Sequence, residues 1–192
     1  PSEMPKLPNF DTNDLLQAII GAEGYVFEER LEHALHHVRK AFSINMLTGD
    51  GELFGLRSSS GTWPLWVGES SEKIVFASET RVDSSDEYEW SMVKAGELVK
   101  ATPSGVERTQ LFPPAERVMR CTLHDFYMAR QDSLMTEELT YGDFRIEGGR
   151  THAEEHPMLP DEVQVVTGVP STALGMAVGM GEVYGVAATE IF

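Results

Sequence analysis

The chain has 192 residues, and its hydrophobic content of 41% is ordinary for a globular core. Its 31 acidic and 15 basic residues give a net charge of −16, which disfavours binding to the phosphate backbone of nucleic acids. No apolar run approaches the length of about 18 residues that a membrane helix needs, and no secretory signal pattern is present. We therefore expect a cytoplasmic protein without a membrane or nucleic-acid partner.

Two amphipathic helices are expected near the start of the chain. Asp11 lies in a polar run of the type that caps helices, directly before an apolar stripe at residues 15–20. Apolar residues at intervals of three and four predict a second helix over residues 27–40. His33 and His37 lie four residues apart in it, but no third metal ligand is evident, so we interpret them as part of a solvated face.

Two β-hairpins are predicted next. Residues 42–48 and 52–57 are strand-like and flank a Gly-Asp-Gly turn at residues 49–51, the strongest hairpin signal of the chain. Residues 93–100 and 105–110 flank a second turn that contains Pro103.

A further strand is expected at residues 74–77, where four apolar residues in a row predict burial on both faces of a sheet. Thr80 and Asp83 follow with the spacing of a capping box, so we expect a helix to begin there. Alternating apolar residues predict another strand over residues 117–130. Its Cys121, the single cysteine of the chain, excludes an internal disulfide bond and is expected to be a small buried residue.

The composition changes after this strand. Residues 131–160 are rich in charge, carry a weak helical pattern and are expected to form a connector. A strand at 163–167, a helix capped by Ser171 or Thr172, and a strand at 183–187 then predict the opening unit of a parallel α/β domain. Because one such unit cannot cover both faces of its sheet, we expect a truncated domain that is the least stable part of the chain.

The segment Tyr127-Met128-Ala129-Arg130-Gln131-Asp132-Ser133 is the most specific motif of the sequence. Shorter motifs occur in order along nearly the whole chain, at residues 11–16, 42–43, 57–68, 77–83, 96–97, 121–133 and 165–173. Together they resemble consecutive landmarks of the amidophosphoribosyltransferase family, in which the first segment reads Tyr-Phe-Ala-Arg-Pro-Asp-Ser. Members of this family open de novo purine synthesis.

The resemblance implies an α+β fold. An α/β/β/α sandwich of the N-terminal-nucleophile glutaminase type, partial in this chain, would precede the start of an α/β phosphoribosyltransferase domain. Residues 1–116 would be the later part of the glutaminase domain, residues 117–160 a connecting strand and helix, and residues 161–192 the first strand-helix-strand unit. The implied reaction transfers glutamine-derived ammonia to phosphoribosyl pyrophosphate and gives phosphoribosylamine in purine (IMP) biosynthesis. A homo-oligomer is implied for the full-length protein.

The resemblance also implies roles for individual residues. Asp11 matches the carboxylate that binds the α-amino group of glutamine, although the residue pattern alone favours a helix cap. Ser171 and Thr172 match a possible pyrophosphate loop. Cys121 matches a position that ligates an iron–sulfur cluster in some members, whose other ligands would lie downstream. Mg²⁺ is an implied cofactor, with ligands outside this chain.

Several family features are missing or changed. The nucleophilic Cys, the arginine-bearing strand and the Asn-Gly oxyanion segment would precede Asp11, and none is present, so the chain as printed is expected to lack glutaminase activity. Gln131 replaces a proline of the family motif, and the loop at residues 169–173 lacks an acidic residue.

Three interpretations stay open. The chain is an internal fragment of an amidophosphoribosyltransferase, a degenerate non-catalytic domain that binds a partner or metabolite, or part of another glutamine amidotransferase such as glucosamine-phosphate synthase or asparagine synthetase. The strand-helix-strand unit after Pro160 disfavours the third, because those enzymes carry other second domains. Pro1, which is not an initiating Met, and the unit cut short at Phe192 favour the first.

Overall fold

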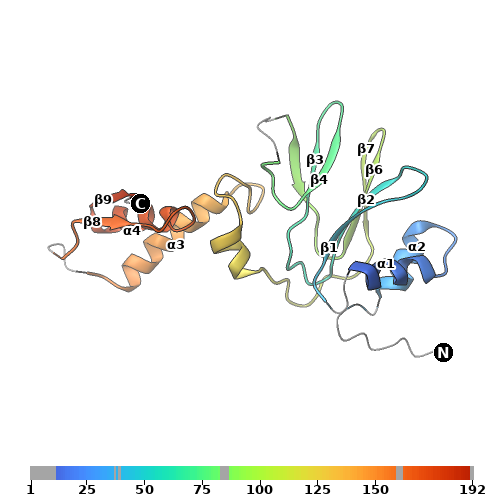
Figure 1. The fold of residues 1–192 in the computed structure, drawn as a ribbon, viewed down its shortest axis with the longest axis horizontal. Helices are drawn as coiled ribbons and strands as arrows, with labels where there is room; N and C mark the ends of the chain where they lie inside the picture. Colours follow the sequence, from blue (N-terminus) through green and yellow to red (C-terminus); the bar gives the residue numbers. More distant parts are fainter. Residues whose placement is uncertain (1–11, 37, 39, 83–86, 159–161, 191–192) are drawn as a thin grey trace.

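The computed structural model describes residues 12–36, 38, 40–82, 87–158 and 162–190. One part of the molecule contains two antiparallel sheets with two helices beside them, and a second part contains a helix pair with a small parallel sheet (Figure 1). None of the helices in the described ranges combines the length and the apolar character that crossing a membrane requires.

The larger sheet has four strands in the order β1-β2-β6-β7. Both predicted hairpins, β1–β2 and β6–β7, are confirmed, and Gly51 closes the first with a φ of 85°, a conformation that favours glycine. The strands are β1 (Ser43–Leu47), β2 (Leu53–Arg57), β6 (Glu97–Thr102) and β7 (Gly105–Gln110).

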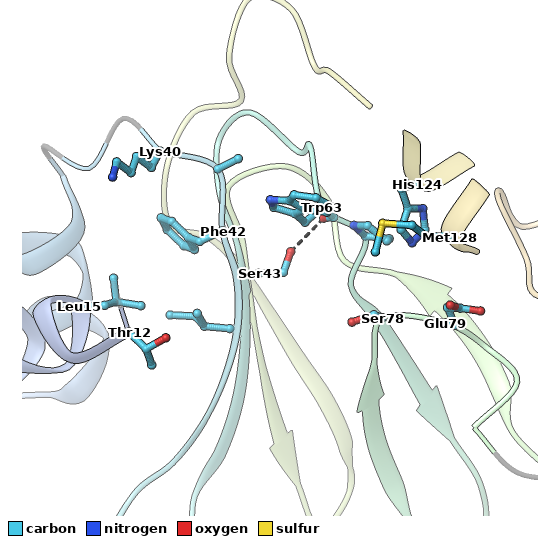
Figure 2. A pocket seen from close by; sticks show the side chains of 13 residues that line it. Thr12, Leu15, Lys40, Phe42, Ser43, Trp63, Ser78, Glu79, His124 and Met128 are labelled. Carbon is cyan, nitrogen blue, oxygen red and sulfur yellow. Dashed lines mark hydrogen bonds between the residues drawn. The ribbon is translucent and has the colours of Figure 1, made fainter. Parts of the chain in front are cut away.

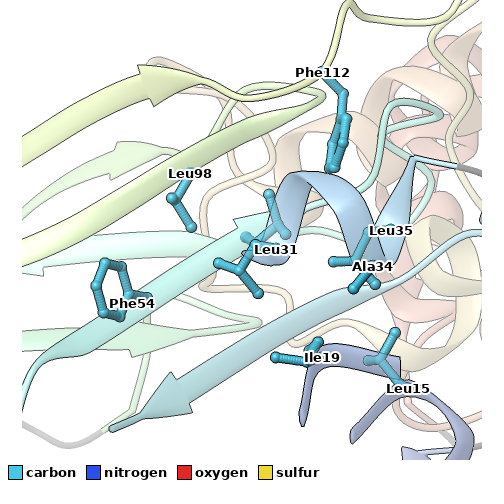
Figure 3. Close-up of a cluster of buried hydrophobic side chains, with 9 residues drawn as sticks. Leu15, Ile19, Leu31, Ala34, Leu35, Phe54, Leu98 and Phe112 are labelled. Carbon is cyan, nitrogen blue, oxygen red and sulfur yellow. The ribbon is translucent and has the colours of Figure 1, made fainter. Parts of the chain in front are cut away.

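Helices α1 (Thr12–Gly21) and α2 (Phe27–Leu35) cover one face of this sheet. Their apolar stripes meet the side chains of β2 and β6 in a buried cluster that includes Leu31, Phe54 and Leu98 (Figure 3). Both predicted helices are thus confirmed, but α2 ends at Leu35 instead of residue 40, and the described residues 36, 38 and 40 are not helical.

The second sheet lies on the other face of the first one. It has the strand order β4-β3-β5, and a buried cluster of Leu65, Val67, Val93 and Val99 fills the space between the sheets. A Cβ atom added at Gly55 of β2 would lie 2.5 Å from the ring of Phe76 in β4, so the sheets pack closely there. The strands are β3 (Trp66–Glu69), β4 (Ile74–Ala77) and β5 (Glu89–Met92).

Two expectations about β4 are wrong. The strand is at the edge of its sheet and all four residues are only partly buried, so it is not covered on both faces. Residues 78–82, which follow it, are bends and irregular backbone instead of a helix start, because the Thr80 hydroxyl accepts a hydrogen bond from the distant Leu134 N–H. Asp83, the other member of the expected capping box, lies outside the described residues.

The strand predicted over residues 117–130 is also wrong. This segment is a loop followed by a single π-helical turn, η1 (His124–Met128). Val118, Leu123 and Met128 are 55–60% exposed, so the alternating apolar residues do not mark a buried face. Cys121 is a free, half-buried thiol in the loop before the turn.

The last part begins with α3 (Tyr141–Glu155), which confirms the weak helical pattern of the connector and starts with a capping box of Thr140 and Asp143. The predicted parallel strand-helix-strand unit is confirmed as β8 (Val165–Thr167), α4 (Leu174–Tyr184) and β9 (Ala187–Thr189). Helix α4 begins after Ser171 and Thr172 and continues to Tyr184, which places the second strand at residues 187–189 instead of 183–187. Helix α3 packs along α4 (Figure 1).

Candidate functional site

A cavity of about 580 Å³ opens where α1, β1, the loop before β3, the end of β4 and η1 meet (Figure 2). Lys40 and Glu79 bring charges of opposite sign to it and lie on opposite sides in the view of Figure 2. Such a lining suits a small ligand that carries both an ammonium and a carboxylate group. The other polar side chains at the cavity are Thr12, Ser43, Ser78 and His124.

Asp11, the candidate glutamine-binding residue, lies outside the described residues. Thr12, the next residue, is the first residue of α1 and lines the cavity. The chain therefore reaches the edge of the cavity at the position adjacent to Asp11.

Glu79 joins the cavity to the motif at residues 127–133. Its Oε2 atom accepts hydrogen bonds from the backbone N–H of Arg130 and the hydroxyl of Ser133, both at 3.0 Å. Ser133 is fully buried. One carboxylate oxygen that faces two donors fixes the path of the motif across the end of the second sheet.

The same motif is bonded to the C-terminal part of the chain. The carbonyl of Ser133 accepts from the N–H of Tyr141 at 3.0 Å, and the carbonyl of Gln131 accepts from the N–H of Gly142 at 2.8 Å. These two bonds satisfy backbone donors in the first turn of α3, which have no partner within the helix. The motif is thus hydrogen-bonded both to the end of β4 and to the start of α3.

A buried polar cluster lies behind the motif. Arg145 of α3 is fully buried and donates to the carbonyls of Asp125 and Ala129, at 3.0 and 2.7 Å. Arg120 binds the Asp125 carboxylate with two hydrogen bonds of 3.1 Å. These contacts hold η1, whose His124 and Met128 line the cavity.

Tyr141 belongs to the same cluster and predicts a pH dependence of stability. Burial raises the pKa of Tyr141 to about 12, with Arg120 opposing and Asp125 reinforcing the shift. The pKa of an unfolded tyrosine is about 10, so between pH 10 and 12 only the unfolded state loses the proton. The favourable contribution is complete below about pH 10, and about 2–3 kcal/mol of stability is lost as the pH rises to about 12.

We therefore expect Tyr141→Phe to remove most of this alkaline loss. Urea unfolding of the unmodified protein and of Tyr141→Phe at pH 8, 10 and 11 measures the loss of stability. Tyr127→Phe is the control, because Tyr127 is 67% exposed. Equal alkaline losses in the two variants would contradict the assignment to Tyr141.

Ser171 and Thr172, the candidate pyrophosphate residues, lie in the turn that joins β8 to α4. The turn is tight, because a Cβ atom at the buried Gly168 would lie 2.6 Å from the carbonyl oxygen of Ala173. Ala173 is the N-cap of α4 and no side chain caps the helix, so the prediction that Ser171 or Thr172 caps it is wrong. The Gln131 side-chain amide donates to the carbonyl of Ser171 at 2.6 Å.

The expected Mg²⁺ ligands and the other cluster ligands lie outside this chain, so both cofactors stay predictions. No group of three or more His, Cys, Asp or Glu side chains among the described residues could hold a metal ion. An iron–sulfur cluster needs several thiolates, and Cys121 is the one thiol of the printed sequence, so these residues could supply a single ligand and the cluster stays a prediction. His33 contacts the carbonyl of Glu23 through its Nδ1 at 2.7 Å, and His37 lies outside the described residues.

Sequence reasoning assigned no role to Glu79, His124 or the side chain of Gln131. Glu79 follows the end of an apolar strand, a position where a carboxylate is a reasonable candidate for binding. The other two had no signal, because their roles depend on contacts with segments far away in the chain.

The comparisons with known proteins agree on one family, although no family model matches the chain. The curated amidophosphoribosyltransferase of Synechocystis sp. is 32% identical over 154 residues, which are 78% of this chain and 30% of the relative. That of Mycobacterium leprae is 30% identical over 182 residues, 93% of this chain and 32% of the relative. These relatives favour amidophosphoribosyltransferase over the other glutamine amidotransferases.

The solved structures support the same fold. Glutamine phosphoribosylpyrophosphate amidotransferase from B. subtilis, complexed with ADP and GMP, matches with a TM-score of 0.82 at 22% identity, over 94% of this chain and 39% of that one. A structure described as the allosteric regulatory enzyme of purine biosynthesis matches with a TM-score of 0.81 at 21% identity, over 93% and 37%. The chain belongs to the amidophosphoribosyltransferase family and spans about a third of the length of the curated relatives it matches.

Proposed function

We propose that this chain is part of an enzyme that transfers ammonia from glutamine to phosphoribosyl pyrophosphate and forms phosphoribosylamine in purine biosynthesis. The observation that carries the proposal is the motif at residues 127–133, which connects the cavity lined by Thr12 and Glu79 to the turn that contains Ser171. The two half-reactions would need such a connection, because ammonia made at one site is consumed at the other.

We also propose the finer architecture. The helix pair α1–α2 and the two sheets would be three layers of an α/β/β/α glutaminase sandwich, within residues 1–116. Residues 117–160 would connect it to the opening unit of the phosphoribosyltransferase domain at 161–192. The full-length protein would be a cytoplasmic homo-oligomer.

In this proposal the cavity contributes to the glutamine site. Asp11 would bind the α-amino group, since a carboxylate and an ammonium form a charge-assisted hydrogen bond. Lys40, which lines the same cavity, would pair with the α-carboxylate of this ligand. The attacking thiol of the family has no counterpart among the residues printed here, so the chain would supply binding groups and no nucleophile.

The turn at residues 168–173 would contact the pyrophosphate of the second substrate. The uncapped start of α4 offers backbone N–H groups and the positive end of the helix dipole, which favour anions. The Mg²⁺ that the family implies has no ligand set among the described residues, and no step of this proposal depends on one.

Asp11→Asn in the full-length protein tests the proposal, because Asn caps a helix about as well as Asp but carries no charge. Loss of one partner of a partly buried ion pair costs about 3–5 kcal/mol, so glutamine use should weaken by at least about a hundredfold. Activity with added ammonia, which bypasses the glutamine site, should be unchanged.

Steady-state kinetics with glutamine and with ammonium salt measure both activities. Asp50→Asn is the matched control, because Asp50 lies in the exposed β1–β2 turn outside this cavity. Full glutamine affinity in Asp11→Asn would leave Asp11 as a helix cap. Absence of phosphoribosyl pyrophosphate-dependent turnover in the unmodified protein would contradict the function itself.

A further inference from the structure

The side chain of Gln131 bridges two segments that lie 40 residues apart. Its Nε2 atom donates to the carbonyl of Ser171 at 2.6 Å, across the start of α3. The family motif that this segment resembles has a proline at this position, and proline has no side-chain donor. The bridge therefore comes from a residue in which this chain departs from that motif.

Gln131 is held firmly at its backbone. Its carbonyl accepts from the N–H of Gly142, and on either side of it Arg130 and Ser133 donate to Glu79. The carbonyl of Ala129, two residues earlier, is bound by the fully buried Arg145. Because its backbone is fixed at these points, the side-chain amide of Gln131 has a defined position from which it donates to Ser171.

The segment that accepts this hydrogen bond, at residues 169–171, is far more exposed to solvent. Val169 is 70% exposed, and Pro170 and Ser171 are exposed as well. The peptide unit between Ser171 and Thr172 is planar, so its C=O and N–H groups point in opposite directions. A donor that fixes the direction of the Ser171 carbonyl consequently fixes the direction of the Thr172 N–H.

We propose that Gln131 is a positioning residue that aims the backbone N–H group of Thr172, in the turn at residues 168–173, toward a pyrophosphate-bearing ligand. The inference rests on the proposed function, which places the pyrophosphate of the substrate at this turn. Backbone N–H groups bind anions best when they are oriented before the ligand arrives, because no ordering cost is then added to binding. Gln131 would therefore affect the affinity for this substrate and leave the glutamine site unchanged.

Two substitutions in the full-length protein test this role. Gln131→Met keeps the length of the side chain without a donor, and Gln131→Glu keeps its shape but places an ionised acceptor against the Ser171 carbonyl. Loss of one hydrogen bond of this kind predicts a rise in KM for phosphoribosyl pyrophosphate of about 2- to 12-fold in Gln131→Met. The rise in KM should be larger in Gln131→Glu than in Gln131→Met, because the carboxylate repels the Ser171 carbonyl.

Other kinetic parameters distinguish positioning from general damage. The KM for glutamine, the kcat with ammonia and the Tm should stay at the values of the unmodified protein. Gln17→Glu, on the exposed side of α1, is the control for the added charge. Equilibrium binding of phosphoribosyl pyrophosphate should weaken by the same factor as the rise in KM.

Three results would overturn the inference. Unchanged KM and binding in both variants, in a protein that uses phosphoribosyl pyrophosphate, would refute the role of Gln131 and leave the proposed function intact. A parallel fall of Tm and of all kinetic parameters would identify a structural role only. Failure of the unmodified protein to bind phosphoribosyl pyrophosphate would refute the proposed function together with the inference.

Discussion

Gly179→Ala should destabilise the C-terminal part of the chain by about 3 kcal/mol, the upper end of the usual cost of overpacking. A Cβ atom at Gly179 would lie 1.9 Å from the carbonyl oxygen of Ile146 and 2.8 Å from the N atom of Arg150. Both are backbone atoms of α3, so a side-chain rotation cannot relieve the clash. The gain of about 1 kcal/mol that Ala normally brings to a helix interior is outweighed.

Urea unfolding, followed by circular dichroism and by hydrogen exchange of α3 and α4, measures this effect. Gly21→Ala is the matched control, because a Cβ atom there has nothing within 4 Å. It should be neutral or slightly stabilising. A Gly179→Ala protein as stable as the control would mean that α3 and α4 do not pack as closely as described.

The close packing of α3 on α4 shows what the predicted stability of the C-terminal unit left out. The expectation of low stability counted only the helix and strands after residue 160, which cannot cover both faces of their sheet. Helix α3, assigned to the connector, packs on α4, and Gly149 of α3 contributes a second close approach, to the Met176 carbonyl. Low stability of the unit compared with the β1–β2 hairpin stays a prediction.

Local signals predicted the elements that depend on neighbouring residues. The β1–β2 hairpin depends on a glycine-rich turn, and the start of α3 depends on residues three apart, so sequence reasoning could find the first and could have found the second. The prediction of a strand over residues 117–130 was wrong because the path of this segment is set by Arg145, which lies in a later helix. The helix predicted to begin after β4 is absent for a similar reason, since the N–H of the distant Leu134 donates to the Thr80 hydroxyl.

The candidate site was predictable to a smaller extent. The family resemblance pointed to Asp11, which lies outside the described residues, and to the turn at Ser171, which is one end of the connection through residues 130–133. The connection itself consists of hydrogen bonds over 40 to 54 residues of separation, for which neither periodicity nor spacing gives a signal. Such contacts arise only when the sheets and the C-terminal helices are in place.

Arg145→Met should destabilise the part of the molecule that borders the cavity by about as much as Gly179→Ala destabilises the C-terminal part. The substitution removes both donors from the carbonyls of Asp125 and Ala129, which are buried against α3. Each buried carbonyl left without a donor costs about 1–3 kcal/mol, so we expect a loss of about 2–6 kcal/mol in the free energy of unfolding.

Arg145→Lys should recover little of this loss, because an ammonium group cannot reproduce the two-pronged geometry of the guanidinium. Arg150→Met on the same helix is the control: Arg150 is 41% exposed and pairs with Glu147 and Glu182 at the surface, where such pairs contribute at most about 1 kcal/mol. Since η1 contributes His124 and Met128 to the cavity, Arg145→Met should also weaken glutamine use in the full-length protein. Urea unfolding of the three variants decides the matter, and equal midpoints for Arg145→Met and Arg150→Met would show that the buried guanidinium does not hold the turn.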